Sequence, residues 1–66
     1  MKLYILKEDI NSYIKAGTVF VKDVKGIYTD GDYYVPEEKD IRSKKYAVHY
    51  DIVENNPHLF EEYSCH

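Results

Sequence analysis

Residues 18–35 have the sequence TVFVKDVKGIYTDGDYYV, which contains the clearest strand signals in the chain. Residues 18–22 are mostly β-branched or aromatic and contain no glycine or proline, which favours a strand. Residues 27–29 and 32–35 flank an Asp-Gly pair at 30–31, and such a pair between two β-prone segments is typical of a two-residue type I′ hairpin loop. The stretch therefore predicts a meander of three antiparallel strands.

Two more strands are predicted outside this meander. Residues 2–6 are short, apolar and β-prone, and residues 46–50 alternate so that two tyrosines and a valine share one face. Pro36 ends the third strand, because a proline cannot donate to a continuing ladder. Residues 36–45 contain one apolar side chain in ten and are predicted to form an exposed loop.

The segment between the first two strands carries a weaker, helical signal. Ile10, Tyr13 and Ile14 have helical spacing, and Gly17 follows at the position of a helix end. This pattern predicts one or two helical turns, with a plain loop as the alternative. Gly17 also allows a backbone φ that other residues resist, which lets the chain turn into the next strand.

The C-terminal segment predicts two short helical turns. Asp51 and Glu54 have the spacing of a capping box, which would open a turn over residues 52–55. Pro57 is well placed as the first residue of a second turn, over residues 58–63. The apolar side chains that would tie these turns to the sheet are Ile52, Val53, Leu59 and Phe60.

These elements predict a mainly β fold of the α+β class. We expect a small antiparallel sheet of four to five strands, or an SH3-like open barrel, closed by the short C-terminal helical turns. The chain has 66 residues, enough for one small domain, predicted here for residues 1–63 with a frayed tail at 64–66. We expect Phe20, Val48 and Phe60 in its core.

Charge and cysteine usage limit the classes of partner. Residues 1–50 hold nine basic against eight acidic side chains, whereas residues 51–66 hold four acids and no base. This balance disfavours general binding of duplex DNA, whose affinity comes from neutralising phosphates. One cysteine, no apolar run of membrane-spanning length and no signal-peptide pattern predict a cytoplasmic protein without membrane contact, in the host cytoplasm if a phage encodes it.

The sequence offers no catalytic or metal-binding pattern. His49, His58, Cys65 and His66 have the right chemistry for zinc, but their spacing matches none of the strong zinc motifs. Cys65 has His66 beside it, yet a mobile tail could not hold an oriented nucleophile and base. We therefore predict a protein that is not an enzyme and that uses no metal or cofactor.

Two motifs carry a resemblance to a known group of proteins. Residues 16–20, AGTVF, and residues 53–60, VENNPHLF, resemble a small module of bacteriophage, prophage and bacterial proteins of unknown function, which has an AGTxF-like strand and a closing VENNPxxF tail. The resemblance implies a compact β-rich fold and a phage or prophage origin. It implies no activity and no catalytic residues.

Eight tyrosines and one basic cluster indicate an interaction surface, although tyrosines can also serve as amphipathic core residues and the charged loop as a solvated one. Neighbouring strand residues point to opposite faces, so one small sheet cannot fully bury both Tyr33 and Tyr34. The candidate interaction residues are Tyr33, Tyr34, Arg42, Lys44, Lys45 and Tyr46.

These residues predict a non-catalytic module that binds a larger protein or another copy of itself. Two alternatives stay open. One is a small β-barrel that binds single-stranded nucleic acid through Lys44, Lys45 and nearby tyrosines. The other is an acidic inhibitor that occupies the nucleic-acid site of a host enzyme with Glu61 and Glu62.

Overall fold

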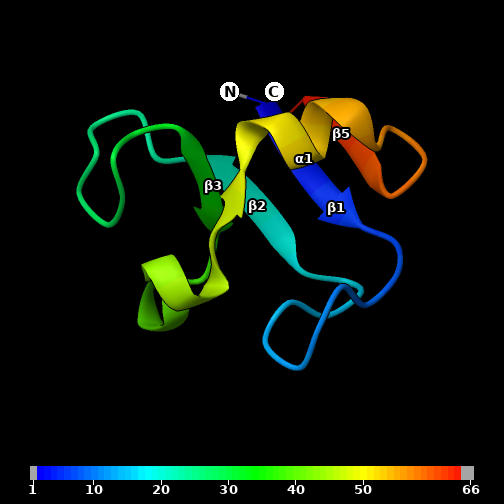
Figure 1. Cartoon of the computed structure of the whole chain (residues 1–66), viewed down its shortest axis with the longest axis horizontal. Helices are drawn as coiled ribbons and strands as arrows, with labels where there is room; N and C mark the ends of the chain where they lie inside the picture. Colours follow the sequence, from blue (N-terminus) through cyan, green and yellow to red (C-terminus); the bar gives the residue numbers. More distant parts are fainter. Residues whose placement is uncertain (1, 65–66) are drawn as a thin grey trace.

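The protein is a five-stranded antiparallel sheet that curls into a half-barrel, which confirms the predicted mainly β fold (Figure 1). The computed structural model describes the backbone of residues 2–64 and the side chains of residues 3–62. Apart from the backbone of Ser64, the predicted tail at 64–66 lies outside the described residues. The elements in chain order are β1 (Lys2–Leu6), β2 (Val19–Lys22), β3 (Tyr33–Pro36), the 3-10 turns η1 (Lys39–Ile41) and η2 (Lys44–Tyr46), β4 (Val48–His49), α1 (Tyr50–Asn55) and β5 (Phe60–Ser64).

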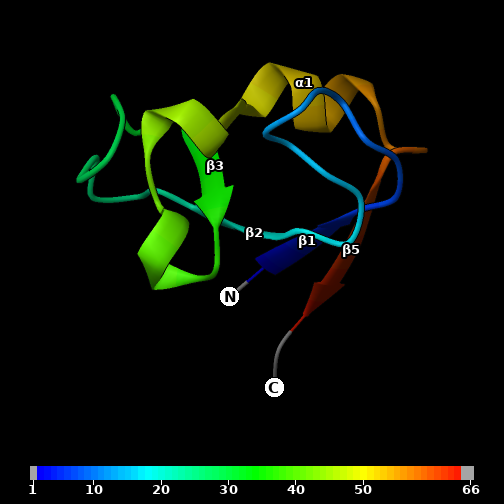
Figure 2. The same cartoon turned by 90° about the horizontal axis from the view of Figure 1, so that it is seen from below.

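The sheet has the strand order β4-β3-β2-β1-β5 and buries apolar side chains on both faces. Phe20 on β2 lies opposite Tyr4 on β1 and Pro36 on β3, and its side chain is fully buried. On that face α1 and the 7–18 loop cover the sheet (Figure 2). The main core on this side consists of Leu6, Ile14, Phe20, Val48, Val53 and Phe60.

A second, smaller cluster occupies the opposite face. It consists of Leu3, Val21 and Val35. Because strand residues alternate between faces, β2 contributes Phe20 to one cluster and Val21 to the other. Burial on both faces explains why the strand is an almost unbroken apolar run, and it confirms Phe20, Val48 and Phe60 as core residues.

The strand and type I′ turn predicted for residues 27–31 are wrong, because residues 23–32 form a loop organised by Asp23. The Asp23 carboxylate is buried and accepts the backbone N–H groups of Ile27 at 3.1 Å, Tyr28 at 3.1 Å and Thr29 at 2.9 Å. It also accepts the Thr29 hydroxyl at 2.8 Å. These donors are satisfied locally and are therefore lost to a strand ladder.

The Asp23 carboxyl is more acidic than usual. Burial alone would raise the pKa of this group. The hydrogen bonds from the Thr29 hydroxyl and from the three N–H groups favour the charged form and outweigh burial, so the pKa of Asp23 lies below its ordinary value. The ionised form of Asp23 therefore holds the loop.

The second C-terminal turn, predicted over residues 58–63, is also wrong. Residues 60–64 form β5, which pairs with β1 and places Phe60 opposite Leu6. The long-range pairing overrides the local helical spacing, because strand formation depends on cross-strand partners more than on propensity.

The first C-terminal turn is confirmed, but it begins at Tyr50 and has a different cap. The side chain of His49, not that of Asp51, accepts the first free N–H of the helix, with Nδ1 at 3.1 Å from the Asp51 nitrogen. Ile52, predicted to tie the helix to the sheet, points outward and is 43% exposed. Val53 alone in α1 is buried.

The remaining connections differ from their simplest predictions in detail. The plain-loop alternative for residues 10–17 is correct, because the Asn11 side chain accepts the N–H groups of Tyr13 and Ile14 at 2.8 and 3.0 Å and prevents a helix. Gly17 has the predicted unusual backbone, with φ at +89°. Pro36 ends β3 as expected. The predicted loop over residues 36–45 contains the 3-10 turn η1, and the strand predicted over residues 46–50 is shorter and consists only of β4, residues 48–49.

Candidate interaction surface

The η2 turn is the centre of the candidate surface. It begins after Ser43, and its backbone is closed by hydrogen bonds from the Tyr46 N–H to the Ser43 carbonyl and from the Ala47 N–H to the Lys44 carbonyl, at 3.1 and 3.2 Å. A turn this tight projects consecutive side chains in divergent directions. Lys44 and Lys45 therefore reach different neighbours.

Two tyrosines far away in the sequence complete this surface. The Lys45 ammonium lies 4.2 Å from the centre of the Tyr13 ring and 6.0 Å from that of Tyr46, and the two rings meet edge to face at 6.0 Å. The Lys44 ammonium lies 5.7 Å from the ring centre of Tyr33. We call the five residues Tyr13, Tyr33, Lys44, Lys45 and Tyr46 the η2 surface.

The η2 surface is positively charged and accessible. Both lysines are exposed, and Tyr13 is 51% exposed. Within residues 3–62, neither ammonium forms an ion pair with a carboxylate. An exposed cation over an aromatic ring gains about 0.5–1 kcal/mol, which orients the side chain without neutralising it. Two positive charges thus stay available to a partner, next to large amphipathic rings.

Arg42, between η1 and η2 in the chain, has a structural role. It is half-buried, and its guanidinium donates from Nε to the Pro36 carbonyl at 3.1 Å and from Nη2 to the Glu37 carbonyl at 3.0 Å. These bonds tie the chain after η1 back to the end of β3. We therefore separate Arg42 from the η2 surface, although the sequence suggested it as a contact residue.

Tyr34 is separated from the other predicted residues by the pleat of β3. Tyr33 pairs with His49, whereas Tyr34 pairs with Val48 and packs against the main core. The Tyr34 ring meets that of Tyr4 edge to face at 5.1 Å, with the Lys22 ammonium 5.2 Å from its centre. Both tyrosines are half-buried, on opposite faces. Tyr13, which the sequence did not single out, contacts the Lys45 ammonium, whereas Tyr34 does not belong to the same cluster.

Further acidic side chains lie on α1 and β5. Asp51 and then burial raise the pKa of Tyr50, while burial and then Glu62 raise the pKa of Tyr4. These shifts show a negative environment around α1 and β5, since nearby carboxylates disfavour a phenolate.

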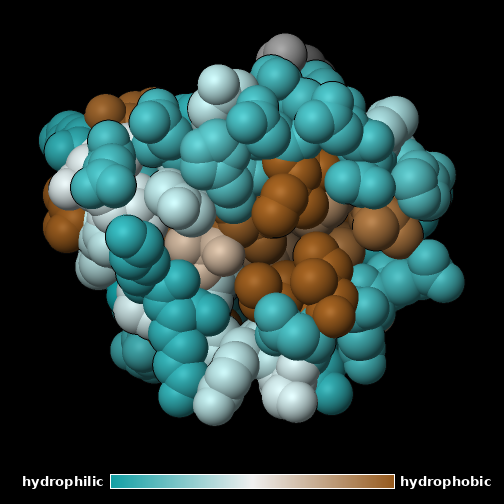
Figure 3. All heavy atoms as spheres, in the orientation of Figure 1, coloured by the Kyte–Doolittle hydropathy of each residue, from teal (hydrophilic) through white to brown (hydrophobic). Residues whose placement is uncertain are grey.

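The 23–32 loop presents a different kind of surface, made of apolar side chains. Val24 is 77% exposed and Ile27 67% exposed, and apolar atoms are visible on the corresponding side of the molecule, at the left of Figure 3. A second apolar area is visible near the centre of Figure 3. Ile52 on α1 and Ile10 in the 7–18 loop are also exposed apolar side chains. Both areas are apolar, so their charge does not indicate what kind of partner they would bind.

Metal ligation and membrane insertion find no support in the residues that the structure describes. Within them, no three His, Cys, Asp or Glu side chains gather as metal ligands would. His49 serves instead as the cap of α1, while Cys65 and His66 lie outside the described residues. None of the described helices has the length and apolar character that crossing a bilayer requires.

The fold and surface define a small half-barrel with a tyrosine- and lysine-bearing turn. Comparison of the chain with protein-family models, with curated proteins and with solved structures finds no match. The resemblance of residues 16–20 and 53–60 to the phage module therefore stays a prediction.

Proposed function

We propose that the protein is a non-catalytic module that binds a partner protein through the η2 surface. The observation that carries this proposal is the position of the Lys45 ammonium near the rings of Tyr13 and Tyr46, without an ion pair to any carboxylate of residues 3–62. Tyrosine supplies large contact area at low entropic cost, and these rings are already oriented. Binding would therefore order few additional side chains.

The perturbed ionisable groups support the non-catalytic part of the proposal, because packing and turn formation account for them. The pKa of Asp9 is lowered mainly by the N–H of Ala16, which closes the 7–18 loop at 2.8 Å. The pKa of Asp23 is lowered by its own loop.

Single-stranded nucleic acid is the second candidate ligand. It is favoured by the same proximity of Lys44 and Lys45 to tyrosine rings, since ammonium groups bind phosphates and rings stack on bases. The Tyr13 ring is less suited to stacking, because the Lys45 ammonium lies 4.2 Å from its centre and occupies one face. We therefore rank a protein partner first.

Affinity capture with matched variants tests the proposal. The full chain is immobilised and exposed to extract of the organism that encodes it, alongside a Tyr13→Ser/Tyr46→Ser variant and a Tyr28→Ser control in the 23–32 loop. We expect one protein to be retained by the native chain and the control, and lost with the double variant. Equal retention by all three chains would contradict the proposal.

Two further arms separate the alternatives. A fluorescent single-stranded oligonucleotide that bound with a steep dependence on salt would identify the nucleic-acid function instead. A Glu61→Gln/Glu62→Gln variant that lost the captured protein, while the tyrosine variant kept it, would favour the acidic inhibitor. Amide spectra of each variant establish that it is folded.

A further inference from the structure

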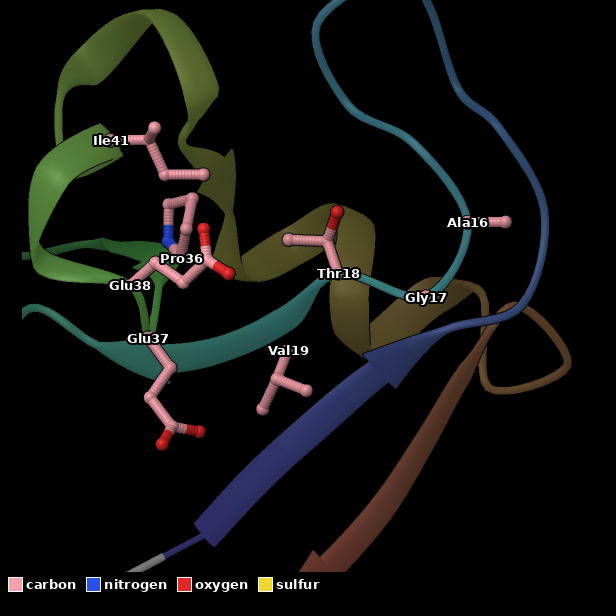
Figure 4. Close-up of a pocket in the computed structure, with 8 residues that line it drawn as sticks. All are labelled: Ala16, Gly17, Thr18, Val19, Pro36, Glu37, Glu38 and Ile41. Carbon is pink, nitrogen blue, oxygen red and sulfur yellow. The ribbon is translucent and has the colours of Figure 1, made fainter.

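A groove distinct from the η2 surface lies where β2 begins and β3 ends (Figure 4). It has a volume of about 460 Å³ and is open to solvent on one side. The hydrogen bond from the Glu37 N–H to the Val19 carbonyl, at 2.7 Å, joins its two walls beyond the last paired residues. The lining residues are Ala16, Gly17, Thr18, Val19, Pro36, Glu37, Glu38 and Ile41.

The groove combines an apolar surface with negative charge. Val19, Pro36 and Ile41 supply the apolar part. In Figure 4 the Glu38 carboxylate turns toward Thr18, and the Glu37 side chain runs alongside Val19. Among residues 3–62, neither carboxylate forms a hydrogen bond or an ion pair, and no basic side chain lines the groove.

We propose that this groove binds an arginine side chain of a partner polypeptide. An arginine has an aliphatic stem that can lie on apolar surface while its charged head stays at the rim. Its planar guanidinium pairs with a carboxylate through two parallel hydrogen bonds, for which Glu38 is placed. Apolar surface and unpaired negative charge together favour this side chain over an anionic or purely apolar one.

Gly17 lies at the rim of the groove, in a backbone conformation that favours glycine. Its φ of +89° disfavours other residues, and its N–H donates to the Leu6 carbonyl at 2.7 Å, which fixes the backbone at this rim. A Cβ atom placed there would meet nothing within 4 Å, so the space beside Gly17 is open. The AGTVF segment thus shapes one wall of the groove as well as starting β2.

An NMR titration of the full chain with Nα-acetyl-arginine methylamide tests this proposal, independently of any binding at the η2 surface. We expect saturable shifts confined to the amides around residues 17–19 and 37–38, with half-saturation on the order of 10 mM for so small a probe. The matched control ligand is Nα-acetyl-citrulline methylamide, which has nearly the same shape without the charge. It should bind about fivefold more weakly, as expected for loss of an exposed ion pair.

Variants locate the charge that matters. Glu38→Gln should weaken arginine binding to the level of citrulline, while Glu61→Gln on β5, at the other end of the sheet, should leave it unchanged. Shifts that do not saturate, equal binding of citrulline to the native chain, or full binding by Glu38→Gln would each overturn the proposal. The citrulline comparison uses the native chain and so holds even if a variant fails to fold.

Discussion

The 23–32 loop and the η2 turn belong to the two connections that flank β3, yet these connections are stabilised in opposite ways. One buried carboxylate, Asp23, accepts four hydrogen bonds and leaves apolar side chains in solvent. The η2 surface rests on short backbone turns and on the Arg42 clamp, with lysines and tyrosines outside. The 23–32 loop depends on one buried carboxylate. The connection that contains η2 instead exposes side chains whose removal should cost little stability.

This contrast indicates where binding can evolve without cost to folding. A change at Asp23 leaves three backbone N–H groups of the loop without their acceptor, which costs a sizeable part of the stability of a small domain. A change at Lys44 or Lys45 removes only exposed cation–ring contacts. Substitutions in the η2 surface can therefore change binding to a partner with little effect on folding.

The largest effect on stability is expected on β2, the central strand of the sheet. Phe20→Ala should lower the free energy of unfolding by about 4 kcal/mol, because it removes a fully buried ring and leaves a cavity beside Phe60. Chemical denaturation monitored by circular dichroism measures the loss, with exposed Ile52→Ala as the control. A native-like midpoint for Phe20→Ala would show that the core has been assigned incorrectly.

The next largest effect tests the Asp23 loop directly. Asp23→Asn should cost about 3 kcal/mol at neutral pH, because a neutral amide cannot accept all four donors as well as a carboxylate does. Asp30→Asn, an exposed acid in the same loop, should change stability by less than about 0.5 kcal/mol. Equal losses of stability at the two positions would show that Asp23 does not hold the loop.

The same carboxylate gives a pH dependence with a defined sign. Since the pKa of Asp23 is lower in the folded than in the unfolded chain, its stabilisation is complete above its unfolded value of about 4 and is lost as the pH falls through the folded one. The difference in unfolding free energy between the native chain and Asp23→Asn should shrink below about pH 4. Thermal melts at a series of pH values measure it, and a difference that grew with acidity would contradict the sign.

A smaller effect is expected at Arg42, which ties the chain after η1 to the end of β3. Arg42→Gln loses two hydrogen bonds to carbonyl groups and should cost about 1 kcal/mol. The exposed neighbour Lys39→Gln serves as the control, with almost no change. Stability equal to that of the native chain would mean that η1 and η2 hold their shape without the guanidinium.

The smallest effect on stability is expected at the surface lysines themselves. Lys44→Gln/Lys45→Gln should lower the unfolding free energy by less than about 1 kcal/mol, because only exposed cation–ring contacts are lost. Binding of the captured partner should nevertheless fall by tenfold or more, roughly 1.4 kcal/mol. A variant that unfolded would place these lysines in the fold and not in the interface.

Local sequence patterns were sufficient for most of the sheet and insufficient for its turns. The strands at residues 2–6 and 19–22 are apolar and β-prone on their own, and the glycine at position 17 could be assigned from its place before β2. Residues 27–29 have the same strand-like composition, but the Asp23 side chain captures their N–H groups. Residues 60–64 become a strand only because β1 lies beside them.

The candidate surface could be predicted in part for the same reason. Lys44, Lys45 and Tyr46 are neighbours in the sequence, and Tyr33 follows from the alternation of β3. Tyr13 reaches Lys45 only after the Asn11 turn brings the 7–18 loop toward η2. No spacing pattern in the sequence relates Tyr13 to Lys45, so this contact could be recognised only from the folded structure.

Crosslinking from within each connection tests the central contrast most directly. A photoreactive benzoylphenylalanine replaces Tyr13 in one version of the full chain and Tyr28 in another, and both are illuminated in extract containing the partner. We predict a protein adduct from position 13 and none from position 28. An adduct from position 28 alone, or nucleic acid instead of protein attached at position 13, would contradict the account.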